Sequence, residues 1–157
     1  MKTEKSIEVL NTLIQAHNDR IEGYETAIKE ADEAFLQEAD LKVLFNQFIQ
    51  TSKHCKNMLA NEVMKLGGVP AQGTNLGKLF RTWMDVKYAL TCNDRYTILK
   101  SCEHGEGIAQ EIYGKIIVDY IEHLSHQHQK LVHEQHQLIK NDHEKVIDLF
   151  NNSLKHE

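Results

Sequence analysis

The sequence predicts an all-α protein that folds as a four-helix bundle. Apolar residues recur at alternating steps of three and four along four long segments, the pattern of helices packed through one face. The 157 residues include 1 proline and 8 glycines, so long helices meet few breaks. No segment alternates apolar and polar residues with the period of two that marks a half-buried strand. We therefore expect a single helical-bundle domain over residues 1–157.

The first part of the chain is expected to form an antiparallel hairpin over residues 3–68. One helix is predicted over 3–36 and a second over 40–66, where Gly67-Gly68 is typical of a helix C-cap. Only a few residues link the two helices, and short links join antiparallel neighbours. The two predicted apolar stripes contain Ile7, Leu10, Ile14, His17, Ile21, Tyr24, Ile28, Ala31 and Phe35, and Leu41, Phe45, Phe48, Ser52, Cys55, Leu59, Val63 and Leu66.

A long crossover over residues 69–93 is expected to follow. About 27 residues separate Leu66 from Asp94, too many for a simple turn. A helix of about 15 residues spans about 22 Å, so the crossover can carry the chain back along the bundle. The second and third bundle helices would then run parallel. The crossover stripe contains Leu76, Leu79, Phe80, Trp83, Val86 and Leu90.

The last part of the chain is expected to form a second antiparallel hairpin over residues 94–155. Its first helix is predicted over 94–122, and Ser125 can cap the helix that follows. The two stripes contain Ile98, Cys102, Gly105, Ala109, Ile112, Ile116 and Tyr120, and His128, Val132, Gln135, Ile139, Asp142, Val146, Leu149 and Phe150.

Composition and charge exclude several classes of function. The formal net charge of −5 argues against a nucleic-acid partner, because phosphate binding needs a basic face. No apolar run approaches the roughly 18 residues that span a membrane, so no membrane partner is expected. The N-terminal residues lack the apolar core of a signal peptide. Three cysteines without a CxxC spacing favour reduced thiols, and these features together predict a cytoplasmic protein.

The one chemical signal is a repeated pair of glutamates. Glu22 and Glu25 form an E-x-x-E motif in the first helix, and Glu103 and Glu106 form another in the third. Residues three apart share a helix flank, so two facing pairs could supply four carboxylates to a metal. In the second hairpin, His143 is as far from the turn as Glu106 and is therefore expected at the same level. These five residues are the candidate metal ligands.

The expected facing of these residues ranks them. At about 100° per residue, Glu25, Glu106 and His143 lie roughly 60° from the centres of their stripes, at the edge of the core, and are predicted to point inward. Glu22 and Glu103 lie roughly 120° away and are second choices. Carboxylate and imidazole ligands suit iron, manganese and zinc. The alternative is that the glutamates are solvated or salt-bridged on the flanks of their helices.

Other polar residues give weaker signals. His133 and His136 are three residues apart and could chelate a transition metal at the surface, although an exposed polar flank is the more common meaning of such a pair. Cys55 and Cys102 lie on apolar stripes and are expected to be inert buried thiols. No pairing of a nucleophile with a base follows from the hairpin geometry, so no catalytic residue is assigned and enzyme activity is left open.

Four segments resemble a known family: N-D-R-I-E-G-Y-E at 18–25, L-G-G-V-P at 66–70, W-M-D-V-K-Y-A-L-T at 83–91 and C-E-H-G-E at 102–106. They resemble a family of uncharacterised bacterial four-helix-bundle proteins that is placed with the ferritin-like superfamily. The resemblance implies a ferritin-like bundle in a bacterial cytoplasm, and members of the family are often linked to stress responses.

The chain departs from the metal-binding pattern of active ferritin-like proteins. Those proteins take a glutamate from two helices and an E-x-x-H motif from each of the other two. Here the second helix has Ser52-x-x-Cys55 and the fourth has Lys140-x-x-His143. The expected site is therefore an altered one, built from E-x-x-E glutamates and His143.

Two functions remain open at this stage. The first is a ferritin-like protein that binds iron, manganese or zinc in the bundle core. The alternative is a non-catalytic structural or interaction module without bound metal. Under the alternative, the long helices and the crossover face could mediate homodimer formation or the binding of another protein. An exposed patch at Trp83 and Phe80, which could also be core residues, is then expected, together with core carboxylates that bond only to protein groups.

Overall fold

The computed structural model describes residues 2–30, 39–73 and 95–155. It contains four long helices and one short 3₁₀ helix: α1 (Lys2–Glu30), α3 (Ala39–Lys65), α5 (Arg95–Asp119), η1 (Ile121–His123) and α6 (His126–Lys155). No strand occurs in these three ranges. The predicted all-α four-helix bundle is confirmed.

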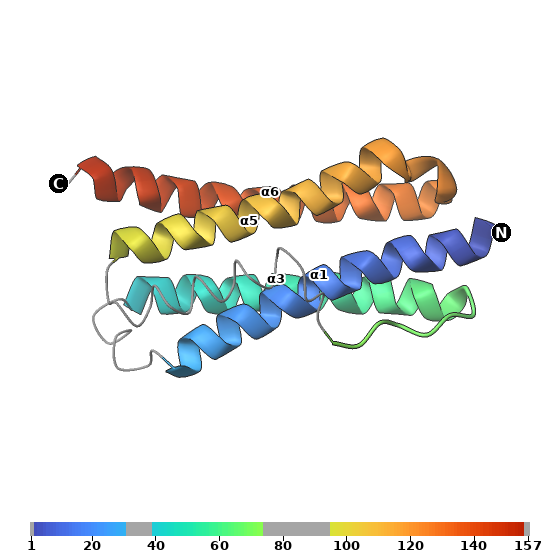
Figure 1. Cartoon of the computed structure of the whole chain (residues 1–157), viewed down its shortest axis with the longest axis horizontal. Helices are drawn as coiled ribbons and strands as arrows, with labels where there is room; N and C mark the ends of the chain where they lie inside the picture. The colour runs from blue at the N-terminus through green and yellow to red at the C-terminus, as the bar shows by residue number, and fades with distance from the viewer. Residues whose placement is uncertain (1, 31–38, 74–94, 156–157) are drawn as a thin grey trace.

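The helices lie in two antiparallel pairs (Figure 1). α1 packs chiefly against α3, and α5 packs chiefly against α6. α3 and α5 run in the same direction along the bundle, as Figure 1 shows. Most of the predicted crossover, including Phe80 and Trp83, lies outside the described residues, and so does the predicted end of the first helix after Glu30.

Local sequence signals set the helix ends. Gly67 has a φ of +84°, and the Gly67 and Gly68 amides donate to the carbonyls of Met64 and Val63, both at 3.0 Å. This pair of bonds is a Schellman motif, which satisfies carbonyls at the end of α3. At the start of α6, the Ser125 hydroxyl accepts from the His128 amide at 3.2 Å, as its predicted capping role requires.

The third helix is shorter than predicted. It ends at Asp119 instead of Glu122, and η1 follows. The amides of His123 and Leu124 donate to carbonyls three residues back, at 3.0 Å each. Tightening of the last turn into a 3₁₀ helix turns the chain toward α6.

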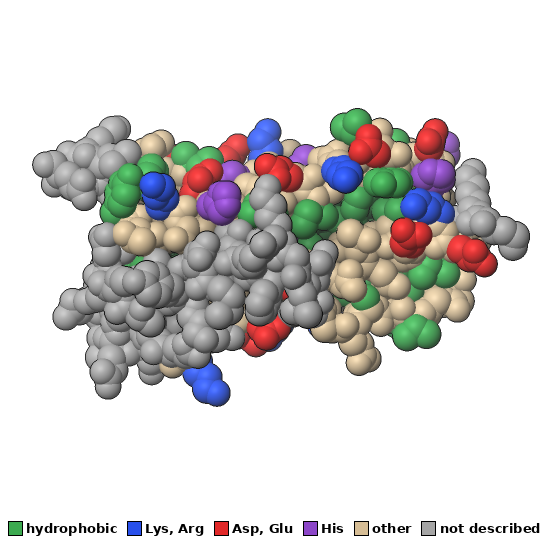
Figure 2. Space-filling view, viewed as in Figure 1, with side chains coloured by type: hydrophobic (Ala, Val, Ile, Leu, Met, Phe, Trp, Pro, Cys, Tyr) green, Lys and Arg blue, Asp and Glu red, His purple; other side chains and the backbone are tan. Residues whose placement is uncertain are grey.

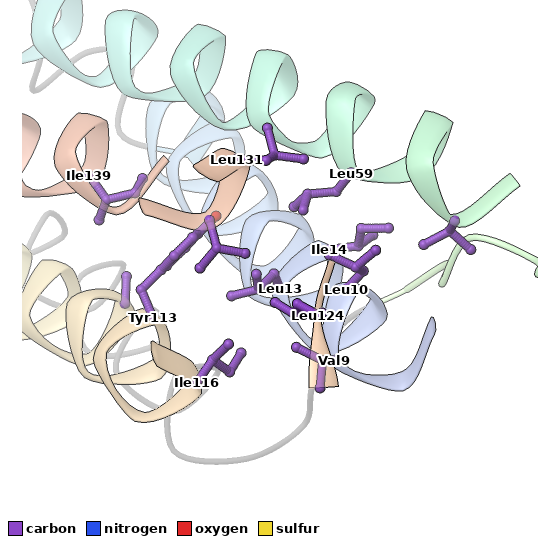
Figure 3. Packing of buried hydrophobic residues seen from close by; sticks show 13 residues of the cluster. Val9, Leu10, Leu13, Ile14, Leu59, Tyr113, Ile116, Leu124, Leu131 and Ile139 are labelled. Carbon is purple, nitrogen blue, oxygen red and sulfur yellow. The ribbon is translucent and has the colours of Figure 1, made fainter. Parts of the chain in front are cut away.

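The core consists of two apolar clusters stacked along the bundle. Near the α5–α6 turn, side chains from all four helices point toward one another (Figure 3). The second cluster includes Tyr24, Phe45, Phe48, Cys102 and Val146 and fills the other half.

On the face shown in Figure 2, acidic and basic side chains are interspersed. None of the described helices is long and apolar enough to cross a membrane.

Polar residues separate the two apolar clusters. On α1, for example, His17 and Arg20 follow the Val9–Ile14 segment of one cluster and precede Tyr24 of the other. The buried polar side chains nearest this level come from all four helices: His17, Arg20, Ser52, Glu106, Gln135 and Asp142.

Candidate functional site

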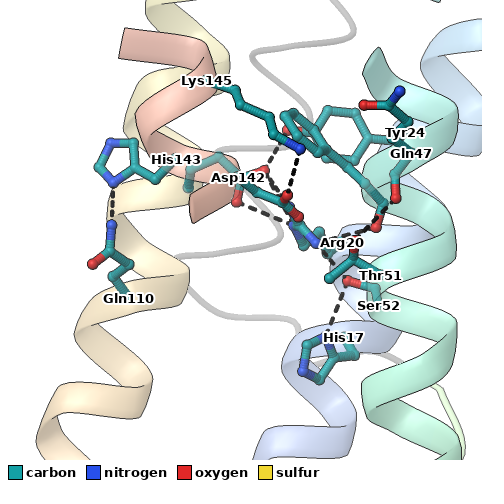
Figure 4. A network of polar contacts seen from close by, with 12 residues as sticks. His17, Arg20, Tyr24, Gln47, Thr51, Ser52, Gln110, Asp142, His143 and Lys145 are labelled. Carbon is teal, nitrogen blue, oxygen red and sulfur yellow. Dashed lines mark hydrogen bonds and ion pairs between the residues drawn. The ribbon is translucent and has the colours of Figure 1, made fainter. Parts of the chain in front are cut away.

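The centre of the polar layer is Arg20, whose side chain is 1% exposed. Its Nε lies 3.1 Å from both carboxylate oxygens of Glu106, and its Nη2 donates to Glu106 Oε1 at 2.7 Å. Nη2 also donates to Asp142 Oδ2 at 3.0 Å (Figure 4). Nη1 donates to the Phe48 carbonyl at 3.1 Å and to Ser52 Oγ at 2.9 Å. One guanidinium on α1 therefore bonds to α3, α5 and α6.

Glu106 is fully buried and accepts from two side chains of α1. Besides Arg20, the Tyr24 hydroxyl donates to Glu106 Oε1 at 2.8 Å. Charge-assisted bonds of this kind are roughly twice as strong as neutral ones. Burial on its own lowers the pKa of Arg20, but the surrounding groups, Glu106 first and Asp142 among them, together raise it by more, so the net shift is upward. Arg20 is therefore a permanent buried cation.

Asp142 completes the charge balance. Its Oδ2 faces Arg20, and its Oδ1 lies 3.8 Å from the ammonium of Lys145, which reaches in from the surface. The two carboxylates of Glu106 and Asp142 thus face two cations. Isolated buried carboxylates are strongly unfavourable, so this pairing explains how two acids fit in the middle of an apolar bundle.

A second chain of hydrogen bonds leads away from Arg20 through His17. His17 Nδ1 lies 3.0 Å from Ser52 Oγ, and His17 Nε2 lies 2.6 Å from the Tyr113 hydroxyl. The Tyr113 hydroxyl donates to Gln135 Oε1 at 2.8 Å, and Gln135 Nε2 donates to the Cys55 carbonyl at 3.1 Å.

These partners fix where the proton on His17 lies. Tyr113 has one hydroxyl proton and gives it to Gln135, so it must accept from His17 Nε2–H. His17 Nδ1 is then an acceptor and receives the Ser52 hydroxyl proton, while Ser52 Oγ accepts from Arg20. Burial, followed by the cations of Arg20 and Lys56, lowers the pKa of His17 to about 3. His17 is therefore neutral, with both nitrogens bonded.

The other buried groups with acidic protons are held protonated. Burial raises the pKa of Tyr24 and of Tyr113 well above 10. Burial also raises the pKa of Cys55 to about 12 and that of Cys102 well above its usual value. Thiols in this state are poor nucleophiles, in agreement with the inert role predicted for both cysteines.

The structure separates the predicted ligands of the first helix from the centre. The prediction that Glu25 points inward is wrong: its side chain is 51% exposed and lies 3.4 Å from Lys53. Glu22 is also exposed. The buried face of α1 is centred between His17 and Arg20, which puts Glu25 roughly 110° away from it.

The predicted ligands of the second hairpin lie together but face different ways. His143 Nε2 lies 3.0 Å from Glu103 Oε1, and His143 Nδ1 contacts Gln110 Nε2 at the edge of the bundle (Figure 4 shows the second contact). Glu103 is half-exposed, while Glu106 turns inward to Arg20. His143 is thus level with the acids, as expected. Its bonded carboxylate is Glu103 and not Glu106.

The residues around Glu106 do not fit a bound divalent metal. A metal at this carboxylate would lie beside the Arg20 guanidinium, which already bonds to both carboxylate oxygens. Among the described residues, no group of three or more His, Cys, Asp or Glu side chains is placed to hold a metal ion. Metal binding by Glu22, Glu25, Glu103, Glu106 and His143 stays a prediction.

The two histidines of the predicted surface pair have different surroundings. His133 is exposed, but the ring of His136 stacks on Tyr113 with a centroid distance of 5.9 Å and an interplanar angle of 7°. Burial lowers the pKa of His136, and His133 and Lys140 lower it further.

Sequence reasoning missed Arg20, the residue on which this site depends. The signals were indirect: Ser52, Gln135 and Asp142 occupy positions in predicted apolar stripes, where polar groups need buried partners. An acid in a core stripe calls for a cation nearby. The sequence alone could not show which of the chain's cations turns inward.

Fold and site together define an all-α four-helix-bundle protein with a buried ionic centre. The chain matches the family described as "Domain of unknown function (DUF2383)" over residues 5–119, and it belongs to that family. No curated protein and no solved structure matches the chain. The matched segment ends with α5, although α6 supplies Gln135 and Asp142 to the buried network.

Proposed function

We propose that this chain is a non-catalytic structural or interaction module whose central cation is a guanidinium instead of a metal ion. The observation that carries the proposal is the position of Arg20. Its nitrogens bond to both oxygens of Glu106 and to Asp142, at the level where a bundle metal would lie. These carboxylates have protein partners, as the module hypothesis expects.

The energetics favour the guanidinium over a metal at this place. A metal bound to Glu106 would have to displace Arg20, whose side chain is 1% exposed. Breaking a buried ion pair from one side costs about 3–5 kcal/mol. Arg20 would also lose its paired hydrogen bonds to the Glu106 carboxylate, which a planar guanidinium forms through two of its nitrogens.

The protonation states in the core support a module that does no chemistry. A general base must reach a substrate and bind a proton near neutral pH, but His17 is buried and its pKa is about 3. A thiol nucleophile needs to ionise, but burial raises the pKa of Cys55 to about 12.

The ferritin-like relationship belongs to the same proposal. The antiparallel packing of α1 with α3 and of α5 with α6 supports it, and the missing E-x-x-H motifs agree with a bundle that has replaced its metal. A role in stress responses and a cytoplasmic location rest on the family resemblance and the sequence.

Metal analysis tests the proposal. Untagged protein would be purified without chelators, and iron, manganese and zinc would be measured by mass spectrometry for the wild type and Glu106→Gln. We expect no stoichiometric metal in either protein, and no change in the wild-type thermal midpoint when EDTA is added.

The opposite result has a clear form. If the wild type carries about one metal per chain, as ligands of this type can hold, and Glu106→Gln loses it, the proposal is wrong and the metal prediction stands. An EDTA-induced fall in the thermal midpoint of the wild type alone would lead to the same conclusion.

A further inference from the structure

The solvent face of α3 carries fewer charged side chains between its two ends than the faces of α1 and α5. Most exposed side chains of α1 and α5 are acids or lysines. On α3, which is described along its whole length, Lys53 is the only exposed charged residue between Leu41 and Met64. Lys53 lies to one side and pairs with Glu25. Absence of charge, with methionine present, distinguishes the centre of a protein interface from ordinary surface.

Seven of the exposed uncharged residues follow one line along the helix, opposite the buried stripe of α3. They recur at steps of four and three, and all are exposed. Val43 at one end is 58% exposed and Met64 at the other is 54% exposed. At 1.5 Å per residue the line is about 32 Å long. We call it the α3 stripe: Val43, Gln47, Gln50, His54, Asn57, Asn61 and Met64.

The order of residues in the α3 stripe reads nearly the same in both directions. An apolar residue stands at each end, two amides follow from each side, and His54 lies at the centre. In a twofold-symmetric pair, residue i of one copy meets residue j of the other and the reverse. If two α3 helices cross antiparallel near His54, Val43 meets Met64 and Gln50 meets Asn57 of the second copy.

We propose that the α3 stripe is a homodimer interface that binds a second copy of this chain, with the two α3 helices antiparallel. The apolar ends of the stripe meet apolar ends in that arrangement. Asn and Gln both donate and accept, so amides can bond to amides across the axis. None of the seven stripe residues is an acid, a lysine or an arginine, so two copies do not repel through them, and the neighbouring Lys53 is paired with Glu25. The inference rests on the proposed interaction function and names its partner.

A pair of charge variants tests the interface. The acidic variant is Gln50→Glu with Asn57→Asp, and the basic variant is Gln50→Lys with Asn57→Lys. In the proposed dimer each variant places like charges opposite one another. The matched control is Gln137→Glu with Asn141→Asp on α6, where both residues are exposed. All these side chains lie on the surface of one chain, so far-ultraviolet circular dichroism should show folded protein throughout.

Sedimentation equilibrium over a range of concentrations gives the readout. We expect the wild type and the α6 control to reach twice the mass of one chain, and the acidic and basic variants each to dissociate at least about tenfold more readily. An equimolar mixture of the two variants should form dimers again, because opposite charges then meet.

Three results would overturn the interface: a monomeric wild type at millimolar concentration, an acidic variant that dimerises like the wild type, or a mixture that stays monomeric. None of them bears on the metal content of the chain, so failure of this interface is distinct from failure of the guanidinium proposal.

Discussion

Arg20 offsets the free-energy cost of burying a polar layer inside an apolar bundle. Two buried carboxylates would each raise the free energy of the folded state, but the guanidinium donates to both of them and to Ser52. The hydrogen bonds that lead from Ser52 to Gln135 require His17 to be neutral. One ring nitrogen of His17 accepts from Ser52 and the other donates to Tyr113, so a second ring proton would have no acceptor.

His17 should therefore make the protein sensitive to acid. Its pKa is about 3 in the folded chain and about 6.5 when unfolded, so the unfolded chain binds its proton first as pH falls. The stability that neutral His17 contributes is fully present above about pH 6.5 and is lost progressively as pH falls toward 3. Between pH 7 and pH 4, wild type should lose about 3 kcal/mol more unfolding free energy than His17→Gln.

Urea unfolding at several pH values measures this difference. Gln at position 17 keeps one donor and one acceptor, so the variant can still fold. His133→Gln is the matched control, because His133 is exposed, and its pH profile should follow the wild type. Parallel profiles for the wild type and His17→Gln would contradict the neutral, buried state of His17.

The site was only partly predictable because its partners are far apart in sequence. Glu106 and Glu25 lie at equal angles from their predicted stripes, yet one is buried and the other is exposed. The difference comes from which face of α1 meets the other helices, and Arg20 takes part in setting that face. The angle from the centre of the stripe cannot distinguish a buried from an exposed glutamate, because a long polar side chain near the edge of a stripe can point into the core or into solvent.

The helices themselves were more predictable, because local signals determine them. Periodic apolar residues indicated each of the four helices, and the Gly67-Gly68 pair marked the end of α3 within one residue. The end of α5 was not predictable in this way. No glycine or proline follows Asp119, and the 3₁₀ turn there depends on packing against the rest of the bundle.

Two glycine substitutions test the origin of the helix ends. Gly67 has a positive φ, and a Cβ there would meet no atom within 4 Å. Gly67→Ala therefore lowers stability only because alanine disfavours this backbone conformation, and not because of a steric clash. We expect it to lower the unfolding free energy by about 1 kcal/mol. Gly114→Ala, in the middle of α5 and equally free of contacts, should raise it by about 0.5–1 kcal/mol.

Thermal and urea unfolding would show the opposite signs directly. Equal effects for the two substitutions would mean that the Gly67 backbone has an ordinary helical conformation, contrary to the Schellman motif.

Polar bonds join the two helical pairs at several levels of the bundle. The hydroxyl of Ser6 donates to the His123 carbonyl at 2.7 Å near one end, and Arg95 donates to Asp40 at 2.6 Å near the other. The hydrogen bond of Arg95 holds the pKa of Asp40 below its usual value. The hydrogen bonds of Arg20 lie between them, so polar bonds connect the two helical pairs at both ends and in the middle of the bundle.

The ion pair between Arg20 and Glu106 joins α1 to α5 at the centre of the bundle, and a double-mutant cycle measures its strength most directly. Arg20→Met and Glu106→Leu should each lower the unfolding free energy by about 3–5 kcal/mol, because each removes one side of a buried ion pair. The double variant should lose less than the two single losses added together, since an apolar pair can fill the same space. Losses that simply add, or an Arg20→Met variant as stable as the wild type, would contradict a guanidinium that holds the centre together.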